Sequence, residues 1–280
     1  MVEPEVAYAD LDDILQLAED FVVAIVGRVL DVHREDLELL GRELAPLEAV
    51  RAPFVRLSYT DAAEMLRGKA ARKMLEDDLI QKQARVSELK SELSEWEKQR
   101  DAPGTKKWKL EKLSHQIHDG REELGDLEES VQNIPQHMEL AAGFVWGKDL
   151  GGSDETILSR MHDRPVLIHR YPKDAKAFYT KVNPDDPRTV LNFDMLAPEG
   201  YGEIIGGSQR EDDYDLLVKR IEEERLPRDA YEWYLDLRRY GSVPHGGFGL
   251  GVERTLAWIC GIKHIRETIA FPRMIHRVTP

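Results

Sequence analysis

The chain is poor in the residues that several common kinds of protein require. It has a single cysteine, Cys260, in 280 residues, which excludes an internal disulfide framework and a cysteine-based zinc site. No run approaches the roughly 20 apolar residues of a membrane-spanning helix. The first 13 residues are acidic and lack the basic and apolar parts of a secretory signal. These absences predict a protein of the reducing cytoplasm.

Basic residues are also scarce relative to acidic ones. The chain carries 39 Lys and Arg against 53 Asp and Glu, so its formal net charge is −14. That balance argues against a protein that holds nucleic acid by its overall charge, but it leaves room for a local basic patch. Hydrophobic residues make up 41% of the chain, enough for a substantial core. The length fits one large domain or two small ones.

The first and last of three regions predict a mixed α and β structure. Residues 1–71 hold a helix that begins after Asp10 and ends near Val32, because apolar residues recur there every three or four positions. Residues 135–280 hold most of the glycine and proline. The strands that we expect are 54–59, 166–169, 177–182, 190–195, 202–209 and 248–250. The helices that we expect in the last region are 212–224, 231–240 and 252–260. The expected strands follow one another in groups, with helices between the groups and without regular alternation of strand and helix. The fold class that we expect is therefore α+β, with an antiparallel sheet flanked by helices.

The middle region, residues 72–134, differs in kind from its neighbours. Between Arg72 and Val131, 12 basic and 15 acidic residues occur, and neither glycine nor proline precedes Pro103. Apolar residues follow a heptad-like spacing on both sides of the turn sequence at 101–105. This pattern predicts an inserted antiparallel helical hairpin, with Gly120 as its weak point. We interpret the charges as the solvated outside of a coiled coil, and contact with a nucleic acid or a partner is the alternative.

The densest group of glycines spans residues 246–254 and ends on Arg254. A helix is expected directly after it, so backbone amides and the helix dipole can face an anion there. Arg254 can place a planar guanidinium against a phosphate. The glycines can equally serve tight packing of a strand against a helix. The segment is neither a Walker loop nor a dinucleotide-binding fingerprint, because GK[ST] and the GxGxxG context are missing.

A second group of polar residues lies on the expected strands 190–195 and 202–209. Asp194 ends one strand and Glu203 opens the next, and two carboxylates brought together in this way suit Mg²⁺ bound through substrate phosphates. Arg210 follows a glycine pair and a serine, where a guanidinium can grip a carboxylate. The plainer interpretations are exposed strand ends for the two carboxylates and a surface ion pair for Arg210.

Taken together, these segments resemble class II aminoacyl-tRNA synthetases, and residues 246–254 resemble motif 3 of that class. The residues of these segments resemble those of the asparaginyl branch. The segments follow one another in the same order as in the family, and all of them lie outside the hairpin. The segments that carry the resemblance are EPEVAYADLDD, YPKDAKAFYTK, GEIIGGSQRE, WYLDLRRYGSVPHGGFGLGVER, HIRETIAFPR and the ending RMIHRVTP.

The resemblance implies an enzyme that activates L-asparagine with ATP and Mg²⁺ and transfers it to tRNA(Asn). It implies that Arg254 holds the γ-phosphate of ATP, while Glu203 and Asp194 hold the metal and the phosphates. The residues that line the nucleotide site would be Gly251, Val252, Glu253 and Arg254, together with Glu203. Relatives form homodimers, so a homodimer is implied for the full-length protein.

The resemblance also assigns the amino-acid pocket. Arg210 would reach the asparagine side chain, with Ser208 and Gly247 beside it. Because a guanidinium only donates hydrogen bonds, it would also accept aspartate, so rejection of aspartate must come from a nearby negative charge. Glu3 and Glu5 are candidates for that charge, and a structural ion pair is the alternative role for both.

The chain departs from the family pattern in several places. It begins where motif 2 of the family should end, so we expect a fragment that lacks the anticodon domain, motif 1 and motif 2. The expected parts are residues 1–71 and 135–280 of the catalytic domain and the hairpin insertion 72–134. The alternative is a free-standing paralogue, which acts as an asparagine synthetase-like ligase or as a non-catalytic binding protein.

Overall fold

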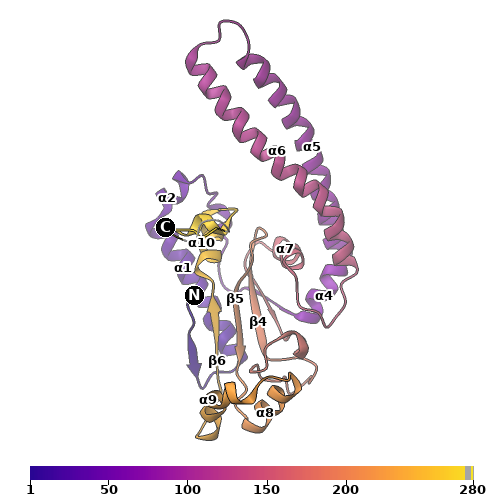
Figure 1. Ribbon diagram of the computed structural model, residues 1–280, viewed down its shortest axis with the longest axis vertical. Helices are drawn as coiled ribbons and strands as arrows, with labels where there is room; N and C mark the ends of the chain where they lie inside the picture. The colour runs from indigo at the N-terminus through magenta and orange to yellow at the C-terminus, as the bar shows by residue number, and fades with distance from the viewer. Residues whose placement is uncertain (275–278, 280) are drawn as a thin grey trace. The chain divides into compact units, whose positions relative to one another are not determined.

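A computed structural model describes residues 1–274 and 279, which form two compact units (Figure 1). The first unit combines Met1–Glu64 with Val145–Pro280, and the second is Met65–Phe144. The family-like ending at 273–280 lies mostly outside the described residues. In the described part of the chain, no helix is long and apolar enough to cross a membrane.

The first unit is built on a six-stranded sheet in the order β1-β6-β5-β4-β3-β2. Its strands are β1 (Glu5–Ala7), β2 (Val55–Ser58), β3 (Val166–His169), β4 (Asn192–Ala197), β5 (Gly202–Gln209) and β6 (His245–Leu250). All neighbouring strands pair antiparallel except β2 and β3, which run parallel. The predicted α+β class is confirmed, with this one parallel pair added.

Helices flank the sheet of the first unit. They are α1 (Leu11–Val32), α2 (Arg34–Leu39), α3 (Ala45–Glu48), α4 (Tyr59–Arg67), α7 (Gly152–Arg160), α8 (Tyr214–Glu223), α9 (Arg228–Arg239) and α10 (Val252–Cys260), and the last residues of α4 pass into the second unit. Short 3₁₀ turns occur at Lys173–Ala175 and Ile265–Thr268. The predicted bounds of α10 are confirmed, and α9 begins three residues earlier than predicted.

The strand predicted at 177–182 is wrong. The amide of Thr180 bonds to the carbonyl of Ala177, so this backbone closes a local turn instead of a ladder. Only isolated bridges remain, from Thr180 to Arg210 and from Val182 to Val190.

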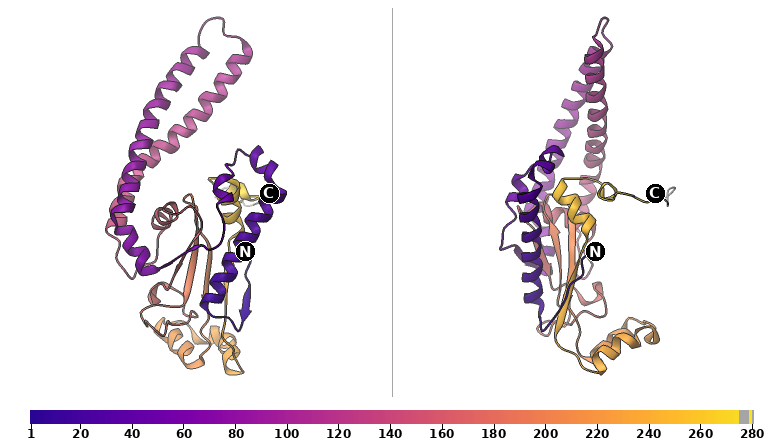
Figure 2. Two further views of the ribbon diagram at one scale, coloured as in Figure 1. Left: turned by 180° about the vertical axis from the view of Figure 1, so that it is seen from behind. Right: turned by 90° about the vertical axis from the view of Figure 1, so that its left-hand side faces the viewer.

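Helix α1 closes one face of the sheet (Figure 2, right). Asp10 starts it as predicted, because its side chain accepts hydrogen bonds from the amides of Asp12 and Asp13, and the Asp13 carboxylate bonds back to the Asp10 amide. Ile14 and Ala18 on the inner face of the helix have no exposed surface. Their partners come from alternate positions of the central strands, so the apolar core lies between α1 and the sheet.

Strand register divides the central strands into an apolar and a polar face. Phe193 of β4 lies opposite Gly207 of β5, which lies opposite Phe248 of β6, and this set faces the core. Because side chains alternate along a strand, the intervening positions face the other way. That second face carries Asp194 opposite Gly206, a pair that belongs to the candidate site described below.

The second unit is a pair of long helices joined by a short turn. They are α5 (Lys69–Arg100) and α6 (Lys107–Ala142), which run antiparallel beside one another (Figures 1 and 2). Leu89, Leu93 and Ile117 form a buried cluster between them. A Cβ atom on Gly120 would lie 3.0 Å from Cδ2 of Leu93 and 3.1 Å from Cζ3 of Trp96, so this glycine marks a close approach of the helices. The assignment of 72–134 as a separate domain stays a prediction.

Candidate active site

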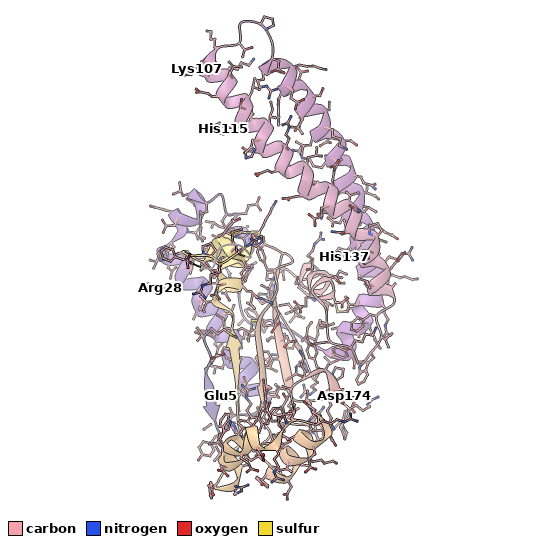
Figure 3. The ribbon with its side chains drawn as sticks, in the orientation of Figure 1. Glu5, Arg28, Lys107, His115, His137 and Asp174 are labelled. Atoms are coloured by element: carbon pink, nitrogen blue, oxygen red, sulfur yellow. The ribbon has the colours of Figure 1, made fainter. Side chains whose placement is uncertain are left out.

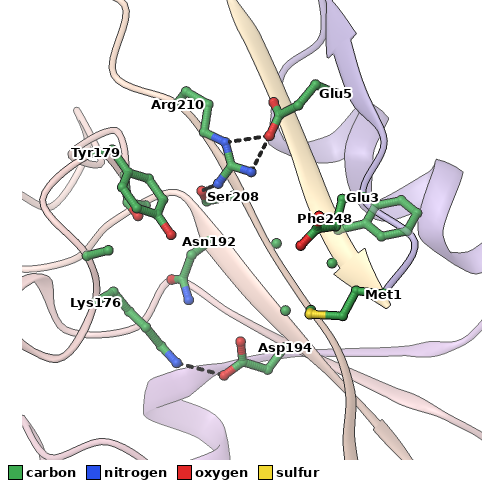
Figure 4. Close-up of a pocket in the computed structure, with 15 residues that line it drawn as sticks. Met1, Glu3, Glu5, Lys176, Tyr179, Asn192, Asp194, Ser208, Arg210 and Phe248 are labelled. Atoms are coloured by element: carbon green, nitrogen blue, oxygen red, sulfur yellow. Dashed lines mark hydrogen bonds and ion pairs between the residues drawn. The ribbon is translucent and has the colours of Figure 1, made fainter. Parts of the chain in front are cut away.

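A cavity of about 610 Å³ opens on the polar face of the central strands (Figure 4). Strands β4, β5 and β6 form its floor, the N-terminal residues up to Glu5 border it on one side, and the turn segment from Lys176 to Thr180 borders it on the other. It therefore joins residues from five separate stretches of the sequence.

Glycines keep the floor of this cavity free of side chains. A Cβ atom on Gly247 would lie 2.2 Å from the backbone oxygen of Pro4, and one on Gly249 would lie 2.9 Å from Cε of Met1. The N-terminal segment thus lies directly against β6, and the close backbone contact with Pro4 requires glycine at position 247. The neighbouring Gly246 faces the core instead, where its Cβ would lie 2.1 Å from Cδ1 of Ile14. The glycine-rich segment therefore serves both the site and the packing.

Two predicted carboxylates meet around a third glycine of the floor. A Cβ atom on Gly206 would lie 2.7 Å from Oε1 of Glu203 and 3.5 Å from Oδ1 of Asp194. A further carboxylate, Glu155 of α7, accepts a hydrogen bond from the Glu203 amide at 3.0 Å. Burial and the charges of Asp194 and Glu155 raise the pKa of Glu203, and burial and the charge of Asp194 also raise the pKa of Glu155. Asp194, which lines the cavity, therefore stands beside two further carboxylates that adjoin it.

Lys176 balances part of that charge. Its ammonium lies 2.8 Å from Asp194 and 3.1 Å from Asp149, over the ring of Tyr171. Burial lowers the pKa of Lys176, but the two carboxylates outweigh this and the pKa is raised overall. For Asp194, in contrast, burial raises the pKa, because burial disfavours the charged carboxylate, and Lys176 offsets part of this effect. Lys176 stays a cation at the border of the cavity.

Arg254 lies in the first turn of α10, as the sequence predicts for an anion-binding residue. Its Nη1 donates a hydrogen bond to the backbone oxygen of Glu203 at 2.8 Å and lies 3.7 Å from the carboxylate of the same residue. The side chain is 53% exposed, so it has free surface for a ligand. Gly251 precedes the helix, and Val252 and Glu253 share this first turn.

Arg210 closes the opposite side of the cavity (Figure 4). Its Nη2 lies 2.5 Å from Oε1 of Glu5, and its Nη1 donates to Oγ of Ser208, also at 2.5 Å. The ring of Tyr179 lies 5.2 Å from the guanidinium carbon. The Arg210 side chain is 16% exposed and that of Glu5 is 53% exposed, so the ion pair considered for Arg210 is present at the edge of the cavity, and its role in binding stays a prediction.

Asn192 is a buried amide that sequence reasoning did not single out. Its Oδ1 accepts the Tyr171 amide, while its Nδ2 is buried without a hydrogen-bond partner and lines the cavity (Figure 4). A buried donor without a partner costs free energy unless a ligand or water accepts from it. Lys176 was also missed, although it lies in the YPKDAKAFYTK segment that carries the resemblance.

Comparison with known proteins identifies the family. Residues 1–275 match the family model described as tRNA synthetases class II (D, K and N). The chain belongs to this family. The match extends through the hairpin as well as through the sheet, so both units of this class II synthetase chain lie within it.

Several similar proteins are asparaginyl enzymes. The class II chain is 44% identical to an asparagine–tRNA ligase of Desulforamulus reducens and 45% identical to one of Sorangium cellulosum, over its whole length. An asparaginyl-tRNA synthetase of Pyrococcus horikoshii, solved with asparaginyl-adenylate, matches with a TM-score of 0.71 and 39% identity over 99% of the chain. The chain spans about half the length of these relatives, 49%, 50% and 48% respectively.

The predicted site residues of this class II chain thus lie in two groups, one at each end of strand β5. Asp194, Glu203 and Arg254 gather around the end of β5 nearest α10, with Gly251 adjoining. Arg210 and Ser208 meet at the other end of β5, and Gly247 lies opposite Ser208 on β6. Their roles in binding stay predictions.

Proposed function

We propose that the chain provides catalytic-domain residues of an asparagine–tRNA ligase. The enzyme would activate L-asparagine with ATP to an enzyme-bound aminoacyl adenylate, release pyrophosphate, and pass the aminoacyl group to tRNA(Asn). The names of the relatives and the adenylate complex of a similar structure support this proposal. The observation that carries it is a glycine-floored cavity with the Arg210 guanidinium at one end and Asp194 at the other, where Glu203 meets Asp194 beside Gly206.

The carboxylate end suits Mg²⁺ and the phosphates of ATP. Asp194 and Glu203 point at the same glycine, and a hard cation with oxygen ligands would neutralise their mutual repulsion. Among the described residues no group of three or more side chains forms a metal cage of its own, which fits an ion held by two carboxylates and substrate phosphates. When bound, the ion would supply charge neutralisation of the pyrophosphate. Arg254 would hold the γ-phosphate with a charge-assisted contact.

The proposed reaction needs positioning and no protein nucleophile. The carboxylate of asparagine attacks the α-phosphorus in line, and pyrophosphate leaves with the electron pair of the broken P–O bond. The flat glycine floor allows both substrates to lie against the strands. Lys176 adds a fixed positive charge beside Asp194, where the negative charge of the substrates would collect.

Amino-acid selection would lie at Arg210. Its guanidinium can donate to the side-chain oxygen of asparagine, while Ser208 and Glu5 fix its orientation. Glu5 stands within hydrogen-bond distance of the same guanidinium, so it can accept from an amide nitrogen but would repel the carboxylate of aspartate. Gly247 lets Glu5 lie directly against β6, because a Cβ atom there would lie 2.7 Å from Cδ of Glu5.

The proposal extends to the setting of the whole enzyme. Its partners would be L-asparagine, ATP and tRNA(Asn), in a homodimer located in the cytoplasm, as expected from the resemblance to the family. These statements concern the full-length protein, of whose relatives this chain matches about half.

Two variants of the full-length protein test the assignment of the two ends. Arg210→Leu should raise the asparagine KM and lower kcat in asparagine-dependent ATP–pyrophosphate exchange, while the KM for ATP stays unchanged. Arg254→Ala should lower kcat/KM for ATP by about 10- to 100-fold, as expected for a lost charge-assisted contact. The opposite assignment, with ATP affected by Arg210→Leu and asparagine by Arg254→Ala, would overturn the proposal.

A further inference from the structure

The turn end of the hairpin concentrates positive charge in an otherwise acidic chain. This hairpin tip, residues 98–112, holds six basic and two acidic residues, a balance of +4 against −14 for the whole chain. The tip holds half of the 12 basic residues that lie between Arg72 and Val131. Its basic residues are Lys98, Arg100, Lys106, Lys107, Lys109 and Lys112.

Most of these charges are not used within the protein. Elsewhere in the hairpin, basic side chains pair across the helices, as Arg85 does with Glu123 at 2.9 Å. At the tip, Arg100 pairs with its neighbour Asp101, and Lys107 approaches Glu111 only to 4.0 Å. In the part of the chain that the structure describes, no ion pair joins a carboxylate to the four other lysines, which are Lys98, Lys106, Lys109 and Lys112.

The three lysines at the start of α6, Lys106, Lys107 and Lys109, lie where they do not stabilise the hairpin, unlike Lys98 in the last turn of α5. Helix α6 begins at Lys107, next to the turn, and has no acidic residue in its first turn (Figure 3). Lys106 occupies the N-cap position and makes no side-chain capping bond. Cations at the N-terminus of a helix oppose the helix dipole. Local stability therefore does not explain why these lysines are here.

An exposed tryptophan accompanies the lysines. Trp108 is 63% exposed, whereas Leu113 and Ile117, further along the same helix, are buried. Trp96 on the facing helix packs against the buried cluster, so the hairpin does bury an indole where packing requires one. Trp108 instead presents its ring to solvent among unpaired ammonium groups.

We propose that the hairpin tip binds RNA. Ammonium groups on flexible side chains fit the phosphates of an RNA backbone, and an exposed indole fits the face of an unstacked base. An acidic protein or an anionic lipid surface would use the charges but offers no base for the indole ring. The inference rests on the proposed function in one respect, since the RNA is then the tRNA that the ligase charges.

Salt-dependent binding of a tRNA(Asn) transcript to the full-length protein tests this proposal. The variant Lys106→Glu/Lys109→Glu should weaken binding at least about fivefold. It should also make the fall of the logarithm of the binding constant with the logarithm of salt concentration less steep, by about 1 to 2, because about two phosphate contacts are lost. Trp108→Ala should also weaken binding at least about fivefold but leave the slope unchanged, since stacking carries no charge.

A matched control lies at the other end of the hairpin. Lys69→Glu/Lys73→Glu makes the same charge change at exposed lysines of α5, and it should change tRNA binding by less than about twofold. Equal weakening by tip and control variants would reduce the effect to net charge and overturn the proposal. Unchanged binding of the tip variants, or tip-dependent binding of anionic vesicles with tRNA binding intact, would also overturn it.

Asparagine-dependent ATP–pyrophosphate exchange separates this inference from the proposed function. The tip variants should retain normal exchange, because the proposed reaction of the two small substrates assigns no role to the tip. A protein without exchange whose tRNA binding still depends on the tip would contradict the proposed function and support RNA binding by the tip. Normal exchange with tip-independent tRNA binding would contradict only the inference.

Discussion

The surroundings of the Glu203 side chain disfavour its charged, carboxylate form. Burial comes first among the causes that raise its pKa, and the neighbouring carboxylates Asp194 and Glu155 add to it. A carboxyl group whose pKa is raised in the folded state destabilises the fold at pH values above that pKa. The penalty is relieved as the pH falls through the raised value towards the ordinary value of the unfolded chain.

The substitution Glu203→Gln should therefore separate stability from activity. At neutral pH the Tm of the ligand-free protein should rise, because a half-buried charge that neighbouring carboxylates repel is removed. The gain should vanish near pH 4, where the ordinary carboxyl is itself half-protonated. ATP–pyrophosphate exchange should fall strongly at the same time. Thermal unfolding followed at several pH values measures the first effect. A Tm lowered at every pH would show that the carboxylate supports the fold.

Residues of the candidate site differ in how far the sequence reveals them. Glu203, Arg210 and Arg254 each stand beside a glycine segment at the end of a strand or the start of a helix, so local patterns single them out. Lys176 and Glu155 lack such a context, because only the folding of distant segments brings them to Asp194 and Glu203. Side chains recruited in this way cannot be found from spacing along one sequence.

At the scale of elements, strand β6 depends on glycine on both faces. On the site face, Gly247 and Gly249 admit the N-terminal segment, and on the core face Gly246 admits α1. Overpacking of such a contact typically costs about 1–3 kcal/mol, and more where backbone atoms block relaxation. The strand thus links the packing of the core to the shape of the site.

Gly246→Ala should destabilise the protein by at least about 2 kcal/mol, because the new methyl group would overlap buried atoms on both sides. It would lie 2.1 Å from Cδ1 of Ile14 and 2.7 Å from the backbone oxygen of Ser208. Gly27→Ala is the matched control, since nothing lies within 4 Å of a Cβ on this exposed position of α1. The control should gain about 0.5–1 kcal/mol from helix propensity. Urea unfolding compares the two, and equal effects would contradict the packing argument.

The elements that were predicted well have strong local determinants. Helix α1 has its capping residues and its periodic apolar face, and β5 has apolar residues between turn glycines. The segment 177–182 shows the same alternation, but the Thr180 amide bonds within a turn, and only the Lys181 amide reaches β5, at the carbonyl of Gln209. The parallel pairing of β2 with β3 also escaped prediction, because strand direction depends on the path of the chain between them.

At the scale of the whole molecule, the chain leaves and re-enters the first unit at one place. The rings of Tyr59 and Trp146 lie 5.9 Å apart, and the Trp146 indole donates to Oγ1 of Thr60 at 3.1 Å. The Gly147 amide donates to the Tyr59 hydroxyl, which donates to the carbonyl of Lys148. This clasp, residues 59–60 with 146–148, holds the two ends of the connection together within the first unit.

We expect the full-length protein to tolerate removal of residues 65–144 when a short glycine–serine linker replaces them. Because the clasp fixes both ends, exchange dependent on asparagine should stay within about threefold of the parent. The second unit would then be a separate domain, as the sequence predicts. Loss of the Tyr59 contact in a Trp146→Ala version of the shortened protein should lower its Tm further. An insoluble or inactive shortened protein would show that the sheet depends on the hairpin.

The clasp also bears on how such a chain can change over generations. A segment whose two ends meet at a fixed point can be gained, lengthened or lost in a gene in a single event, without passing through an unfolded protein. Selection can then alter the outer end of the hairpin while the sheet and its cavity are conserved. Sister lineages should therefore vary most in the length of this segment and least at the aromatic pair on which it closes.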